Sequence, residues 1–153
     1  MSIDQRLAEL GITLPEPAAP VAAYVPAVAI NGLLHISGQI SFAEDGSLIK
    51  GRLGEDMGLE AGIAAARRCG IMLLAQIKAA LGSLDRVERI VKLGVFVSST
   101  PNFVDQPKIA NGASELMQDV FGDIGKHARS AVGVTVLPLG VAVEVDAIVA
   151  VKS

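Results

Sequence analysis

The sequence predicts a single α+β domain in which a mixed sheet carries two long helices on one face. The length of 153 residues is typical of one domain and leaves little chain for a second core. Segments with alternating apolar residues are interspersed with two amphipathic segments in the order β-β-α-β-α-β-β. Two helices can cover only one face of a sheet of five or six strands, so the other face needs a partner.

The first 18 residues are expected to form an N-terminal helix and linker, appended to the core of a domain that spans residues 1–153. Ser2 stands three residues before Gln5, which is the spacing of a capping box. Gly11 supplies a left-handed end for this helix. The connector that follows contains three prolines: Pro15, Pro17 and Pro20.

A β-hairpin is predicted next. A run rich in β-branched residues from Tyr24 to Ile30 is followed by Asn31-Gly32 and then by a second apolar run. The Asn-Gly dipeptide tolerates the positive φ that a two-residue hairpin turn requires at both positions. Residues 41–56 combine charges with glycines and show no period, which predicts a long loop with room for a short edge strand at 48–50.

The two helices and the strand between them have distinct periodicities. Apolar residues recur at three- and four-residue steps from Leu59 to Leu81, and again from near Asp105 to Gly122. Between these segments, residues 90–98 alternate between apolar and other side chains. Such alternation is typical of a strand that is covered on one face.

The last two strands, Ser130–Val136 and Val141–Val151, are predicted to form a hairpin around a tight turn. The register of this hairpin would place Glu144 and Asp146 of the last strand close to Arg129. Both carboxylates and the guanidinium would then share one face of the sheet.

The face that the helices leave uncovered is expected to pack against copies of itself in a closed ring. Most of its residues are small or apolar, whereas a face in contact with water would carry many more polar side chains. The alternation assigns to this face Lys92, Gly94, Phe96, Arg129, Ala131, Gly133, Thr135, Ala142, Glu144, Asp146 and Ile148.

Arg129 therefore has two interpretations. It forms an interface ion pair with Asp146 or Glu144, which is the commoner role of a buried charge. Alternatively, its guanidinium donates two parallel hydrogen bonds to the carboxylate of a small ligand. Composition and spacing do not separate the two.

Other reactive side chains have structural alternatives. The segment Ser37–Gln39 either directs N–H groups at an oxyanion or forms a turn at the end of a strand. The two histidines, His35 and His127, lack a companion cysteine at ligand spacing, so no metal site is predicted. Cys69 lies on or beside an apolar helix face, where a buried inert thiol is expected. Tyr24 either packs or directs its hydroxyl into a pocket.

Composition limits the classes of partner. A formal charge of −3, five aromatic rings and no tryptophan disfavour nucleic acid, which attracts basic and aromatic surfaces. Prolines and glycines interrupt the longest uncharged stretch, residues 17–43, so no membrane span is predicted. The first residues lack the pattern of a secretory signal, and one cysteine forms no intramolecular disulfide, so a cytoplasmic location is expected.

The chain resembles the reactive intermediate deaminases, the RidA or YjgF-type proteins, and in particular their longer subgroup. The likeness covers residues 20–152 and is carried by the order and spacing of four segments. These segments are Ile36–Ile40, Val95–Val97, His127–Val132 and Val143–Ile148. The resemblance implies a fold related to that of chorismate mutase from bacilli. It also implies a homotrimer whose sheets close into a central barrel, with clefts between subunits.

The resemblance implies an activity as well. Such proteins hydrolyse enamines and imines of small 2-keto acids to the keto acid and ammonia, without a cofactor because the substrate already contains the C=N bond. By position, Arg129 would bind the substrate carboxylate and the backbone N–H of Ala131 would share it. Glu144 would position and activate the attacking water.

Four further positions match residues that line the cleft in the family. These are Tyr24, Ser37, Gly38 and Asn111. Gly38 would give the ligand close access to the backbone.

Two positions depart from the family pattern. His127 stands where many members have proline and adds a titratable group at the cleft rim, whereas Ala131 replaces a frequent cysteine. The resemblance favours Glu144 over Asp146 as the partner of Arg129.

A non-catalytic carboxylate-binding protein of the same fold is the alternative function. A ribonuclease or translation inhibitor, as some relatives are labelled, fits poorly with the charge and the few aromatic rings.

Overall fold

The structure, a computed structural model, describes residues 1–17 and 23–153; Pro20 of the predicted connector lies outside them. Its main elements follow one another along the chain. They are α1 (Ile3–Glu9), β1 (Ala27–Ile30), β2 (Leu33–Ile40), α2 (Leu59–Leu81), β3 (Val87–Ser98), α3 (Gln106–Phe121), β4 (Ala128–Val134) and β5 (Val143–Val151).

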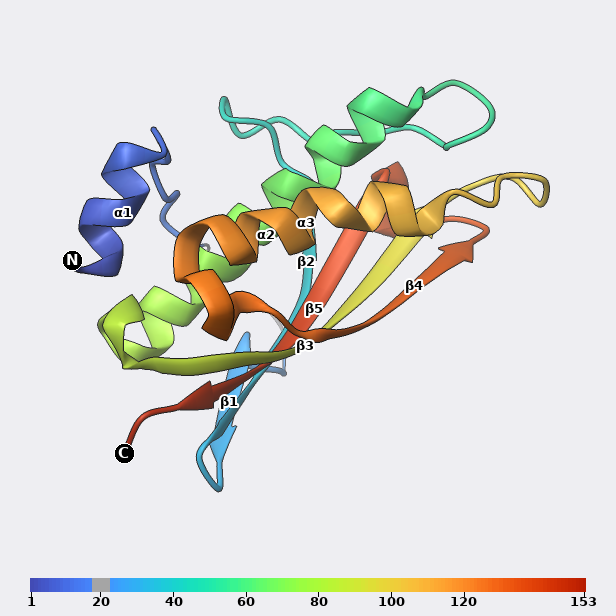
Figure 1. Cartoon of the computed structure of the whole chain (residues 1–153). Coiled ribbons are helices and arrows are strands. Elements are labelled where there is room, and N and C mark those ends of the chain that lie inside the picture. The colour runs from blue at the N-terminus through green and yellow to red at the C-terminus, as the bar shows by residue number, and fades with distance from the viewer. Residues whose placement is uncertain (18–22) are drawn as a thin grey trace.

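The five strands form one mixed sheet in the order β1-β2-β5-β3-β4. The two long helices, α2 and α3, pack side by side against one face of this sheet (Figure 1). The predicted α+β class, with two long helices on one face of a mixed sheet, is confirmed. The core lies between the two layers, and its largest fully buried side chains include Leu73, Ile77, Leu93 and Leu116.

Local sequence signals explain the boundaries of several elements. Asn31 and Gly32 have φ values of 52° and 77°, so the Asn-Gly turn joins β1 and β2 as predicted. The helix α2 ends at Leu81, and Gly82 caps it with a left-handed φ of 82°. The loop after β2 forms only isolated bridges, including one between Phe42 and Leu48.

None of the helices in the described ranges is long and apolar enough to cross a bilayer.

The predicted C-terminal hairpin is wrong. β4 pairs with β3 in parallel, and β5 lies between β2 and β3, antiparallel to both. The reason is that α3 carries the chain back along the sheet, as a crossover helix does, so β4 runs in the direction of β3. The apolar strand β5 then fills the central position, where both of its edges are hydrogen-bonded.

This correction moves Arg129, Ala131 and Gly133 to the other face of the sheet. Arg129 aligns with the buried Leu93 and reaches α3, so these three positions lie on the helix side. From β4, the open face receives Ser130 and Val132 instead, because successive side chains of a strand alternate. Thr135 lies beyond the end of β4, and Ala142 is fully buried.

The remaining predictions for the open face hold on β3 and β5. Glu144, Asp146 and Ile148 lie there, as do Lys92, Gly94 and Phe96. The alternation expected over residues 90–98 is interrupted at Val91. A bulge at Val91 and Lys92 leaves Val91 exposed, and Ile90 takes the buried position.

The N-terminal helix is more than an appendage. Leu7 is 5% exposed and belongs to the hydrophobic core. Polar contacts anchor α1 at several points, because Arg6 Nε donates to the Asp119 carbonyl at 2.8 Å and Asp4 forms a 3.1 Å ion pair with Lys78. The predicted capping box of Ser2 with Gln5 is present.

Candidate functional site

Arg129 is held at the edge strand by α3. Its Nη1 donates to Asn111 Oδ1 at 2.8 Å and to Ser114 Oγ at 3.1 Å. Asn111 and Ser114 are three residues apart, so they lie on the same side of the helix. Within the part of the chain that the structure describes, Arg129 forms no ion pair with Glu144 or Asp146.

The guanidinium lines a pocket of about 290 Å³ at the junction of α3 and β4. Residues 1–17 and 23–153 provide no hydrogen-bond partner for Nε or Nη2 of Arg129. These two groups donate in one plane, which is the geometry that a carboxylate accepts. The pocket is lined by Asn111, Ser114, Glu115, Gln118, Lys126, His127 and Arg129.

His127 extends the hydrogen-bond chain that holds Arg129. Its Nδ1 lies 2.6 Å from the Gly125 carbonyl oxygen, and its Nε2 lies 2.9 Å from Ser114 Oγ. A carbonyl only accepts, so Nδ1 is assigned the proton. Nε2 then accepts from the Ser114 hydroxyl, whose oxygen accepts from Arg129. Burial lowers the pKa of His127 and the nearby charge of Arg129 adds to the effect, although the Gly125 carbonyl opposes it.

The replacement His127→Asn is expected to lower the free energy of unfolding more at about pH 7.5 than at about pH 5. The pKa of His127 is lower in the folded chain than in the unfolded chain. Between the two values the unfolded chain binds more protons, so the stabilising contribution of His127 rises with pH. It is lost as the pH falls below about 6.5 and through the folded value.

Urea unfolding of both chains at the two pH values measures this contribution. Equal destabilisation at both pH values, or a larger effect at the acidic one, would contradict the neutral assignment of His127.

A second cluster of predicted residues lies on the open face of the sheet. A bulge in β2 at Ser37 and Gly38 places Gly38 against Glu144, and a Cβ on Gly38 would overlap the carboxyl group of that side chain. The Ser37 hydroxyl donates to the Pro26 carbonyl at 3.2 Å. Tyr24 precedes β1 and is 60% exposed, so its ring does not pack in the core.

The carboxylates of this cluster hold protons more strongly than isolated ones. Burial raises the pKa of Glu144, and repulsion from Asp146 adds to the increase. Burial also raises the pKa of Asp146, against the opposing effects of the Gly94 N–H and the Lys92 charge. A carboxylate with a raised pKa is a stronger general base once it is ionised.

The two clusters lie on opposite faces of the same sheet. Arg129 and Asn111 lie on the helix side, whereas Ser37, Gly38 and Glu144 lie on the open side. One copy of the chain therefore cannot direct Arg129 and Glu144 at the same small molecule. The side chain of Ala131 is partly buried against the core on the helix side.

Sequence analysis missed Ser114, which joins Arg129 to His127. Its helical spacing from Asn111 is the signal that could have identified it. The expected burial of the Cys69 thiol is confirmed, since this residue is fully buried with its Sγ 3.3 Å from the Val143 carbonyl oxygen, and burial raises its pKa. In the described ranges no three histidine, cysteine or acidic residues gather as metal ligands would.

Comparison with known proteins reveals clear relatives. Residues 4–149 match a family model described as "YjgF/chorismate mutase-like, putative endoribonuclease". Protein TCP17 from Trypanosoma cruzi is 51% identical over 94% of this chain and 90% of its own length.

Two solved structures show the same fold. A protein of unknown function from Agrobacterium tumefaciens is 43% identical, with a TM-score of 0.91 over 98% of this chain and 92% of that chain. RidA from an Antarctic Psychrobacter is 28% identical, with a TM-score of 0.59 over 89% of this chain and 94% of that chain.

Proposed function

Because the chain belongs to the YjgF/RidA family, whose fold is chorismate-mutase-like, we propose that it hydrolyses reactive imines and enamines of small 2-keto acids. One observation carries the proposal. The Arg129 guanidinium lines a pocket and is fixed by Asn111 and Ser114, and its Nε and Nη2 have no hydrogen-bond partner among residues 1–17 and 23–153. A carboxylate is the group that such a planar pair of donors recognises.

The reaction divides between the two clusters. Arg129 binds the substrate carboxylate, with the backbone N–H of Ala131 as a second donor, and this orients the C=N bond. Glu144 accepts a proton from water as the oxygen adds to the imine carbon and returns it to the nitrogen, which gives a carbinolamine. The hydroxyl proton of the carbinolamine is then transferred through Glu144 to the nitrogen as the C–N bond breaks, so the products are the keto acid and ammonia. The C=N bond is already reactive, so the chemistry needs no cofactor.

The proposed site requires a second copy of the chain. Packing of the open sheet faces into a homotrimer would bring Ser37, Tyr24 and Glu144 of a neighbouring subunit toward Arg129. The open face supports this arrangement because it carries exposed apolar side chains, including Val28 and Val132. Sedimentation velocity tests it: a monomer at micromolar concentration would rule out the shared site.

A coupled assay tests the activity. A threonine dehydratase releases the imine and enamine of 2-oxobutanoate, and the appearance of the keto acid is timed in a buffer that slows spontaneous hydrolysis. We expect the protein to accelerate keto acid release in proportion to its concentration. No acceleration by a correctly assembled oligomer would refute the deaminase proposal.

A carboxylate-binding protein without turnover is the second candidate. The observation that favours it is the separation of Arg129 and Glu144 on opposite faces of one chain. In that case 2-oxobutanoate would bind with a dependence on Arg129, and the coupled assay would show no acceleration.

The replacement Gly38→Ala is expected to lower kcat by about tenfold with little change in stability. The added methyl group would occupy the place of the Glu144 carboxyl group, which lies at the end of a flexible side chain and can move away. The fold then tolerates the change, but the proposed general base is displaced. Steady-state kinetics and thermal unfolding of the same preparation measure both effects. Full activity in the variant would separate Gly38 from the mechanism.

A further inference from the structure

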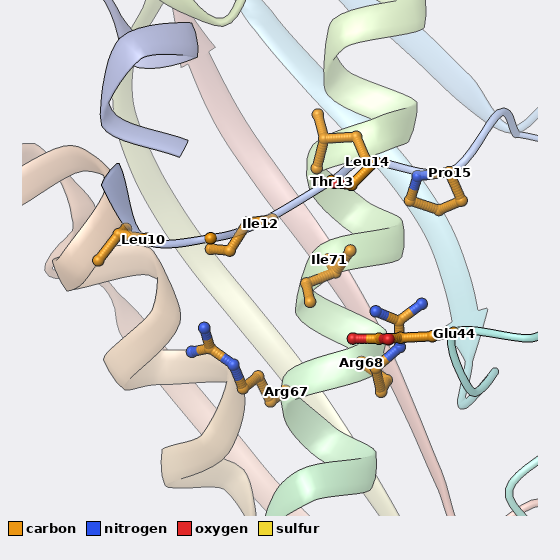
Figure 2. A pocket seen from close by; sticks show the side chains of 10 residues that line it. Leu10, Ile12, Thr13, Leu14, Pro15, Glu44, Arg67, Arg68 and Ile71 are labelled. Atoms are coloured by element: carbon orange, nitrogen blue, oxygen red, sulfur yellow. The ribbon is translucent and has the colours of Figure 1, made fainter. Parts of the chain in front are cut away.

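A cleft on the helical layer lies apart from both clusters described above. It is formed by residues 10–15 after α1, by one side of α2 and by Glu44 of the loop after β2, and its volume is about 420 Å³ (Figure 2). Clefts of this size accommodate small molecules. Its lining residues are Leu10, Gly11, Ile12, Thr13, Leu14, Pro15, Glu44, Arg67, Arg68 and Ile71.

Arg67 is the feature of this cleft that points to a ligand. The chain has seven arginines, and six of them donate a side-chain hydrogen bond to another described residue. Arg67 is the exception among residues 1–17 and 23–153, although its side chain is partly buried. Figure 2 shows it extending from α2 toward the extended segment that forms the opposite wall. A partly buried guanidinium with no partner among these residues can donate hydrogen bonds to an anion.

The lining of the cleft is mainly polar, but apolar side chains stand beside Arg67. Arg67 and Ile71 are four residues apart on α2, so they lie on the same side of the helix. Leu10 and Ile12 provide apolar contacts from the other wall. That wall is held in place, because the Ile12 N–H donates to the Leu7 carbonyl at 2.9 Å and Leu7 is part of the core.

The remaining charges restrict the ligand to a single negative group. Arg68 Nε is already occupied by a 2.8 Å hydrogen bond to the Phe42 carbonyl, so this arginine is turned toward the loop. Glu44 contributes a carboxylate at the same end of the cleft as Arg68 (Figure 2). The opposite charges of Arg68 and Glu44 largely offset each other there, which leaves Arg67 as the positive charge available to one anionic group.

We propose that this cleft binds a small amphipathic monocarboxylate, with Arg67 holding the carboxylate and Leu10, Ile12 and Ile71 contacting the hydrocarbon. This binding site is separate from the deaminase chemistry proposed for Arg129 and does not depend on it. The ligand would lie against α2 on the helical layer. The open face of the sheet is on the opposite side of the molecule's sheet and takes no part in this site.

Titration with hexanoate tests the proposal. The experiment uses the full chain carrying Arg129→Ala, so that the other candidate carboxylate site is removed. We expect saturable shifts of backbone amide resonances at Ile12, Arg67 and Ile71. Adding Arg67→Gln should weaken hexanoate binding about tenfold, which corresponds to about 1.4 kcal/mol. Hexanamide, which has the same chain without the charge, should bind about tenfold more weakly than hexanoate.

Arg86→Gln is the matched control, because Arg86 is an exposed arginine whose Nη1 donates to the Leu81 carbonyl outside the cleft. It should leave hexanoate binding unchanged. The proposal is overturned if hexanoate causes no saturable shift up to about 20 mM, or if Arg67→Gln binds as tightly as its parent. Equal binding of hexanoate and hexanamide would also overturn it. Deaminase activity does not enter these results, so the two proposals fail independently.

Discussion

Replacing Arg129 with alanine is expected to lower kcat/KM for imine hydrolysis by about 10²- to 10³-fold, or about 3 to 4 kcal/mol of transition-state stabilisation. The variant loses both the positive charge and the planar pair of donors that would orient the substrate carboxylate. Asn111 and Ser114 remain, but their polar groups cannot bind a carboxylate bidentately. The coupled dehydratase assay, run across a range of substrate concentrations, measures the loss.

Arg129→Lys is the control that separates charge from geometry. Lysine keeps the positive charge, but its ammonium group does not present two parallel N–H donors. We expect a smaller loss than for alanine, with most of it in KM if the carboxylate is bound equally in the ground and transition states. Sedimentation must show the same oligomer for all three chains. A fully active, correctly assembled Arg129→Ala protein would remove Arg129 from the mechanism.

Local signals predicted most of the helices and turns. The helix from Leu59 to Leu81 was expected from its apolar period and has those boundaries in the structure. The turn at Asn31 and Gly32 followed from backbone sterics alone. Such features depend on residues that are close together in the chain. A single sequence therefore contains the information needed to predict them.

The order of strands could not be obtained in the same way. The segment around Pro138 contains turn residues and was expected to join a hairpin, but it connects the edge strand β4 to the central strand β5. Which strand pairs with which depends on burial of the whole apolar strand β5 and on the path of α3. Neither is encoded in the turn itself.

The wrong pairing of β4 also gave Arg129 the wrong surroundings in the candidate site. Sequence reasoning singled out Arg129 but placed it on the same face as Glu144. A strand presents successive residues to opposite faces, so a wrong partner strand changes the surroundings of every side chain on it. His127 was noted for its titratable ring, yet its link to Arg129 through Ser114 depends on how α3 packs over β4.

Gly112→Ala is expected to destabilise the protein by about 2 to 3 kcal/mol, even though alanine favours helices. Gly112 lies in α3 where this helix crosses α2, and a Cβ there would overlap the backbone carbonyl of Ile63 and approach the backbone nitrogen of Arg67 at 3.1 Å. Backbone atoms of a packed helix cannot move aside as a flexible side chain can. The two helices must therefore separate, which opens the core between them.

Separation of the helices would also disturb the site, because Asn111 and Ser114 flank Gly112 on α3 and hold Arg129. Urea unfolding gives the change in stability, and the coupled assay on the folded fraction gives the change in activity. Gly58→Ala is the matched control, since a Cβ on Gly58 would meet no atom within 4 Å. Gly58 is the N-cap of α2, where alanine is less favourable than glycine, so this change should cost at most about 1 kcal/mol. If Gly112→Ala were as stable as Gly58→Ala, the close contact between α2 and α3 would not be what positions Asn111 and Ser114 over Arg129.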